Sequence, residues 1–133
     1  MKSLIYTTNS TATVVAPGSR VPVGYVQRRL GCDFNVNGDN IFINKAGYYL
    51  IDFSATITAG AAGDVKLNLV QNGETIASST ESIATANTLF HTAAIPGVVR
   101  VYCCAGATVS IEVDATSTAT PTIQSSALRI VRY

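Results

Sequence analysis

The most regular pattern of hydrophobic and polar positions in the chain runs from residue 49 to residue 57. Apolar side chains occupy every odd position, and polar ones occupy the even positions from residue 52 onward: Tyr49, Ile51, Phe53, Ala55 and Ile57 against Asp52, Ser54 and Thr56. A period of two is the signature of a β-strand that buries one face. The sequence therefore predicts a long strand here, which a polar break at residues 44–47 separates from a short strand at residues 41–43.

A β-hairpin is predicted directly after this strand and a small-residue loop at residues 58–64. Apolar and polar residues alternate over residues 65–69, and the dipeptide Asn72-Gly73 follows. Both turn residues accept the positive φ that a type I′ turn requires. The chain should therefore return as a strand over residues 74–78.

The next segments alternate more weakly. Residues 79–87 are polar and rich in alanine, which favours an exposed loop, with a helical turn at residues 81–86 as the alternative. One apolar face then follows, made by Leu89, His91, Ala93 and Ile95. Pro96-Gly97 is expected to end that strand.

The chain continues with three more β-prone segments. Two strands are predicted at residues 98–104 and 109–114, and a polar loop at residues 115–121 leads to the closing strand at residues 127–133. No segment has the pattern of a helix of useful length. Eight to ten short strands at this spacing are typical of an all-β sandwich.

The length of 133 residues fits a single domain with one core. Residues 1–24 mix Thr, Ser, Val, Pro and Gly, so we expect an N-terminal arm or edge strand there, with the folded domain spanning residues 25–133. Residues 25–30 fit either a strand or one helical turn.

Composition adds an expectation of self-association. Only 13% of the residues are charged, about half of the roughly 25% that is usual for a soluble domain. Interfaces are depleted of Lys, Glu and Asp, so an oligomer would hide part of this neutral surface. The net charge is +1, and the basic residues are scattered except for Arg28-Arg29, which argues against nucleic acid as a partner. No apolar run approaches the roughly 20 residues of a membrane span or forms a signal peptide, so we expect neither membrane insertion nor signal-directed export from the cytoplasm.

Candidate catalytic groups are few. His91 is the only histidine, and no pattern places it beside a nucleophile. Cys103 and Cys104 point to opposite sides of a predicted strand. Glu112 and Asp114 share an exposed face, and two carboxylates placed in this way are more typical of solvation or edge protection than of glycosidase chemistry. We therefore expect no enzymatic activity, no catalytic residue and no cofactor.

A metal site is not expected either. Residues 33–39 begin like a calcium loop of the EF-hand type, but position 44 holds Asn44 where the bidentate glutamate should stand, and the flanks are strand-like. A polar turn is the better interpretation. The three cysteines, Cys32, Cys103 and Cys104, have no zinc or redox spacing, and we expect them to stay reduced without a required disulfide.

The order of these segments resembles the jelly roll shared by tumour necrosis factor and the globular heads of complement-type collagenous proteins. Residues 43–57 match a strand motif with Gly47, Tyr49 and Phe53; residues 65–73 match a strand that ends in Asn-Gly; and residues 102–111 match a late strand motif in part. The acidic residue that follows the glycine of that late motif is replaced by Ala107, so any calcium or polar-network role of that acid is lost. The resemblance covers residues 40–133 and implies an antiparallel two-sheet jelly roll that forms a homotrimer.

The chain is also similar to small proteins encoded by phages and prophages of Gram-positive anaerobes, through Gly47-Tyr48-Tyr49 with the following Ile51-Asp52, and through residues 100–104. This resemblance implies a structural virion protein, such as a capsid decoration, head fibre or tail appendage, with capsid or tail proteins as partners. No Gly-X-Y stretch stands before residue 40, which weighs against a spore-coat protein. The alternative is an adhesion module that binds a host-surface glycan or receptor through the loops at residues 58–64, 79–87 and 115–121, although these lack tryptophan.

The trimer contact is expected on the sheet face opposite the core. On the central strand that face carries Tyr48 and Leu50, and Tyr102 and Tyr133 are candidates to join them. Tyrosine rings bury a large area at a small loss of rotamer entropy, and their hydroxyl groups can still find partners.

Overall fold

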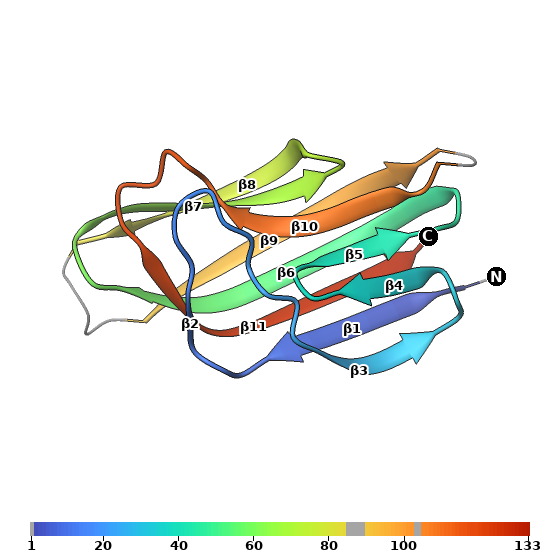
Figure 1. Ribbon diagram of the computed structural model, residues 1–133, viewed down its shortest axis with the longest axis horizontal. Helices are drawn as coiled ribbons and strands as arrows, with labels where there is room; N and C mark the ends of the chain where they lie inside the picture. The colour runs from blue at the N-terminus through green and yellow to red at the C-terminus, as the bar shows by residue number, and fades with distance from the viewer. Residues whose placement is uncertain (1, 85–89, 103–104) are drawn as a thin grey trace.

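A computed structural model describes residues 2–84, 90–102 and 105–133, which form two antiparallel β-sheets packed face to face (Figure 1). The first sheet has the strand order β3-β1-β11-β6-β9, with β2 on β11, and the second has the order β4-β5-β10-β7-β8. The strands of the first sheet are β1 (Leu4–Asn9), β2 (Thr13–Val14), β3 (Tyr25–Leu30), β6 (Gly47–Ala59), β9 (His91–Val101) and β11 (Pro121–Arg132). Those of the second are β4 (Phe34–Asn37), β5 (Asn40–Ile43), β7 (Gly63–Gln71), β8 (Glu74–Ile83) and β10 (Ala107–Val113). The predicted all-β, two-sheet jelly-roll sandwich is confirmed.

The central strand β6 follows the predicted alternation. Its odd positions from Tyr49 to Ile57 are buried between the sheets, and β6 pairs with β11 and β9 along most of its length. The Tyr49 hydroxyl donates a hydrogen bond to the Lys45 carbonyl over 2.8 Å, and the ring lies edge-on to Phe34. Burial raises the pKa of Tyr49 above its ordinary value, and the Asp33 carboxylate adds to this effect. The polar atom of the largest buried side chain is thus satisfied within the fold.

The Asn72-Gly73 hairpin is also confirmed. Asn72 has a φ of 51° and Gly73 a φ of 81°, as a type I′ turn requires. The expected loop at residues 79–87 is wrong for its first part, because β8 continues to Ile83. The segment is rich in Ser and Thr and pairs with β7 as far as Gly63, so neither a loop nor a helical turn begins before residue 84. Residues 85–89 lie outside the described residues.

The expected strand break at Pro96-Gly97 is wrong. β9 runs without interruption from His91 to Val101. It is one of the two edge strands of the first sheet, where a proline is tolerated because one side of the strand has no partner to bond. A Cβ atom at Gly97 would lie 2.6 Å from a methyl carbon of Leu69 in the second sheet, so any other residue here would force the Leu69 side chain to shift.

The N-terminal segment is not an arm. β1 lies inside the first sheet, hydrogen-bonded to β11 on one side and β3 on the other, and Ile5 and Thr7 are buried. The edge strand is β3, so residues 25–30 form a strand and not a helical turn. Threonines at outward and inward positions alike hid the period of β1 in the sequence.

The segment between β2 and β3 joins the two sheets. The Val21 amide donates a hydrogen bond to the Ile111 carbonyl, and Val15, Val21 and Val23 are buried in the common core. No helix among the described residues is long and apolar enough to cross a membrane.

Candidate functional site

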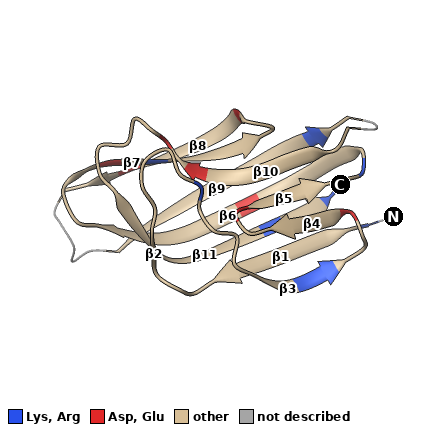
Figure 2. Cartoon of the chain, in the orientation of Figure 1, with Lys and Arg blue, Asp and Glu red and all other residues tan. Residues whose placement is uncertain are grey.

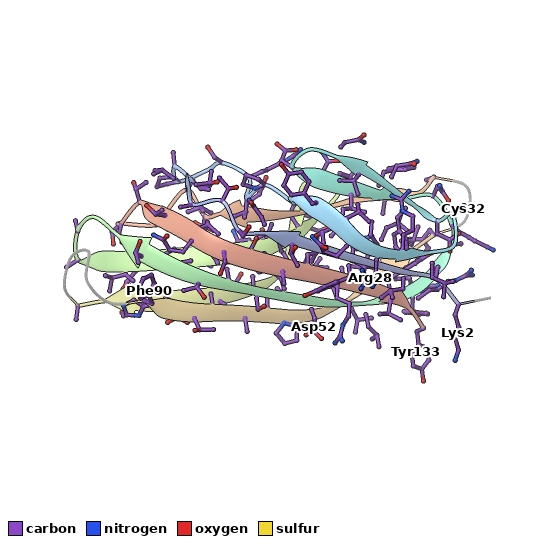
Figure 3. All side chains as sticks on the ribbon, turned by 90° about the horizontal axis from the view of Figure 1, so that it is seen from below. Lys2, Arg28, Cys32, Asp52, Phe90 and Tyr133 are labelled. Carbon is purple, nitrogen blue, oxygen red and sulfur yellow. The ribbon has the colours of Figure 1, made fainter. Side chains whose placement is uncertain are left out.

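The outer face of the first sheet gathers exposed apolar side chains from three strands at one end. Register places Tyr48 opposite Arg100 and Leu50 opposite Val98, and the Tyr133 amide bonds the Tyr48 carbonyl over 2.9 Å. We call Tyr48, Leu50, Val98, Tyr102 and Tyr133 the tyrosine cluster. Their exposed fractions are 51%, 44%, 56%, 65% and 90%. Figure 3 shows Tyr133 pointing away from the sandwich at this end.

All four residues expected at a trimer contact therefore lie on one exposed surface of the chain. Two further residues on this surface, Val98 and Arg100, were not among those expected from the sequence. Val98, Arg100 and Tyr102 are two positions apart, so the sequence indicates that they share one side of a strand. The expected break at Pro96-Gly97 gave no reason to place this segment beside β6. Their contact with Tyr48 and Leu50 depends on the register between β6 and β9, which only pairing in the folded sheet sets.

Arg100 is held between two rings of the cluster. Its guanidinium carbon lies 4.4 Å from the centroid of Tyr102 and 5.5 Å from that of Tyr48. Both distances are in the range of a cation–π interaction, worth about 0.5–1 kcal/mol at an exposed site. The positive charge is thereby placed among aromatic faces on the surface.

The middle of this face is shallowly hollowed. Asp52 and Arg129 form an exposed ion pair there, beside a depression of about 300 Å³ that Tyr6 and Ala94 also line. A second depression of about 430 Å³ lies between Leu50, Pro96 and Val98. Figure 3 shows Asp52 on the same side of the molecule as Tyr133. The face is thus uneven and partly apolar, which suits a macromolecular contact better than a deep ligand pocket.

The polar residues that could carry chemistry are used elsewhere. Glu112 lies 3.6 Å from Arg20, and His91 is half-buried at the far end of β9. The Asp114 carboxylate accepts hydrogen bonds from the Asn68 amide and from Thr116, which hold its pKa well below the usual range. The described residues contain no group of three potential metal ligands. Cys103 and Cys104 lie outside the described residues, and Cys32 is exposed with a free thiol.

Residues 33–39 form β4 and the turn after it, and their carboxylates pair with arginines of the same chain. They span β4 and the turn to β5, in which Asp39 lies 3.4 Å from Arg20 and Asp33 lies 3.9 Å from Arg132. The polar turn preferred over a calcium loop is confirmed.

Two of the three loops considered for adhesion meet at one end of the sandwich. Asp64 and Thr118 exchange hydrogen bonds, which tie the loop after β10 to the start of β7. Residues 58, 59, 63 and 64 belong to strands, so the first loop is shorter than expected. The remaining candidate, residues 79–87, is strand as far as Ile83, and its residues 85–87 lie outside the described residues.

Solved structures share this fold at low sequence identity. Murine APRIL at pH 5.0 superposes with a TM-score of 0.76 at 15% identity, over 100% of both chains. The globular domain of zebrafish complement 1qA gives 0.64 at 14% identity, over 97% of this chain and 94% of that one. The Eiger TNF of S. frugiperda gives 0.69 at 12% identity, over 100% and 92%. These likenesses establish a TNF-like jelly-roll fold.

Among curated proteins none matches the chain. Residues 4–133 match the family described as the BclA C-terminal domain. The absence of a Gly-X-Y stretch therefore no longer argues against a spore-coat protein, because the family match rests on residues 4–133 alone. The match begins within β1, in agreement with the place of that strand inside the sheet. The chain belongs to the BclA C-terminal domain family.

Proposed function

We propose that the chain is a non-enzymatic structural head that assembles as a homotrimer through the outer face of its first sheet and is displayed on an outer surface. The observation that carries the proposal is the tyrosine cluster. Five large side chains, each more than two-fifths exposed, lie together on one face of a protein with few charged residues. Contiguous exposed apolar surface of this kind marks an interaction site.

Membership of the BclA C-terminal domain family and the TNF-like fold support a structural role. Tyrosine suits the centre of such a contact because its ring buries a large area while its hydroxyl group finds polar partners. The stacked Arg100 fits too, since arginine is enriched in interfaces.

Light scattering and sedimentation of the purified chain test the assembly. We expect a mass near three times the 13.9 kDa of one chain. Tyr48→Asp should lower that mass, because it places an unpaired carboxylate in an apolar contact. Asn35→Asp is the matched control: it adds the same charge at an exposed position of β4, on the second sheet, and should leave the mass unchanged. A wild-type monomer at micromolar concentration would refute the proposal.

The finer location is a spore surface or a virion. The virion appendage implied by the phage resemblance remains part of the proposal, with capsid or tail proteins as docking partners. Immunogold labelling of purified spores and of purified virions from the organism that encodes the chain distinguishes the two. Labelling of the cytoplasm alone would contradict both.

Adhesion to a host-surface glycan or receptor is the second candidate. It is favoured by the meeting of the loops around Asp64 and Thr118 at one end of the sandwich. A glycan array probed with the trimer is the direct test. Thr116 is an exposed residue of this group, so adhesion is supported if a substitution at Thr116 abolishes glycan binding. If the trimer binds no glycan, only the structural role is left.

A further inference from the structure

Charge is divided between the two sheets. The strands of the first sheet carry five arginines and one carboxylate: Arg28, Arg29, Arg100, Arg129 and Arg132 against Asp52. Those of the second sheet carry four carboxylates and one lysine: Asp64, Glu74, Glu81 and Glu112 against Lys66. A chain with a net charge of only +1 therefore has a basic and an acidic part.

Most carboxylates already have a partner within the chain. Ion pairs or side-chain hydrogen bonds engage six of the eight: Asp33, Asp39, Asp52, Asp64, Glu112 and Asp114. In the described part of the chain, the two without such a partner are Glu74 and Glu81. Both lie on β8, which is one edge strand of the second sheet, the other being β4.

β3, one of the two edge strands of the first sheet, carries the opposite charge. Arg28 and Arg29 on β3 have no carboxylate partner among the residues that the structure describes. All six residues of β3 are exposed, including Tyr25 at 73% and Leu30 at 55%. A strand with both faces and one edge uncovered is unusual in a sandwich in which most strands bury one face.

The two edges lie on opposite sides of the molecule. β3 and β8 stand at opposite ends of the two stacked strand orders (Figure 1). Figure 2 shows basic residues on β3 and an acidic one at the turn that begins β8. A ring of three copies joins two different surfaces at each contact, one from each neighbour. Opposite charges on opposite sides meet that requirement.

We infer that, in the homotrimer of the proposed function on which this inference rests, the β3 edge of one copy lies against the β8 edge of the next, with Arg28 and Arg29 facing Glu74 and Glu81. The partner of both edges is a second copy of this chain. The tyrosine cluster supplies the apolar contact, and the two edges supply charge complementarity, which fixes the register of neighbours and rejects wrong pairings.

A competing explanation is that these charges only keep open edges from aggregating, as charged residues on edge strands do. Protection of that kind works with either sign of charge. Pairing between edges requires opposite signs, so exchanging the charges separates the two explanations.

The experiment measures trimer dissociation by sedimentation equilibrium in low and high salt. Arg28→Glu with Arg29→Glu should weaken the trimer about tenfold or more, and Glu74→Arg with Glu81→Arg should do the same, because each places like charges together. The variant with all four substitutions should recover wild-type affinity. The single variants Lys45→Glu and Arg29→Glu make the same change of charge. Lys45 is exposed and lies on neither edge, so Lys45→Glu should change trimer dissociation less than Arg29→Glu does.

Each remaining outcome is decisive. If both double variants form the wild-type trimer, the edges do not meet, although the trimer itself stands. If they weaken it and the fourfold variant does not recover, the edges face other partners. A monomeric wild type would overturn this inference and the proposed function together. Unchanged melting temperatures of the isolated variants would show that the substitutions do not act through folding.

Discussion

The outer faces of the two sheets differ in how their side chains are satisfied. The first presents Tyr48, Leu50 and Val98 to solvent, whereas Ile76 is the one large exposed hydrophobic residue on a strand of the second sheet in the described part of the chain. On the second face, polar side chains bond one another: Ser78 donates to Asn68, and Asn68 donates to Asp114. The polar groups of the second face thus find partners within the chain, whereas the first face exposes apolar side chains that a partner would bury.

This difference shows that strand periodicity alone does not identify a solvent face. Both sheets bury one side in the same core, and alternation is visible both in β6 and in the first half of β7, as far as Leu67. What separates the outer faces is whether each polar or apolar group has a partner inside the chain.

The largest expected loss of stability follows from breaking the second sheet at its hairpin. Asn72→Pro should lower the free energy of unfolding by more than about 2 kcal/mol, because proline cannot adopt a positive φ and removes the amide that bonds Thr108 over 2.9 Å. Urea unfolding measures it. Asn72→Gly keeps the turn conformation and should lose less, and equal losses for the two variants would contradict the turn argument.

The polar network of the second face is the next target. Asn68→Ala should cost about 1–3 kcal/mol, because Asn68 is buried and its removal takes away the acceptor of the Ser78 hydroxyl and one of the donors to Asp114, which keeps Thr116. Ser54→Ala, at an exposed position on the first face, should stay within about 0.5 kcal/mol. Similar costs at the two positions would mean that the faces do not differ in this way.

The central ion pair of the first face gives a smaller effect that reports on whether the face is covered. In the Tyr48→Asp background, expected to be monomeric, Asp52→Asn should change stability by less than about 1 kcal/mol, because the pair with Arg129 is exposed. In the wild-type background the cost should be larger, since a covered ion pair that loses one partner leaves an unpaired charge. Thermal melts with and without Asp52→Asn in each background provide the comparison. An identical loss of stability in the two backgrounds would argue that the trimer leaves this part of the face open.

Acid should produce the smallest and most local change. Hydrogen bonds from Asn68 and Thr116 hold the Asp114 pKa below the ordinary value of 3.8, so the unfolded chain binds the proton more readily than the folded one. The stabilisation is present above that value and is lost as pH falls through and below it. Asp114→Asn should flatten the pH dependence of the melting temperature in this range. A parallel curve for variant and wild type would exclude this carboxylate as the source.

Much of the fold was readable where one principle acted alone. The alternation around Tyr49 and the Asn72-Gly73 turn both predicted the structure because each depends on local geometry. Pro96-Gly97 was misjudged because an edge strand tolerates proline, and the position of a strand within a sheet is not written in its own residues. The same holds for β1, whose threonines gave no clear period although the strand lies inside the sheet.

The sequence by itself determined the central strand β6, the hairpin after it, the all-β class and the outward direction of Tyr48 and Leu50, since these follow from the period of two and from local turn chemistry. The tertiary structure alone decided that Val98, Arg100, Tyr102 and Tyr133 stand beside them, and that β3 and β8 form open edges of opposite charge. The reason is that neighbours in a sheet come from segments far apart in the chain, and only the pairing register brings their side chains together.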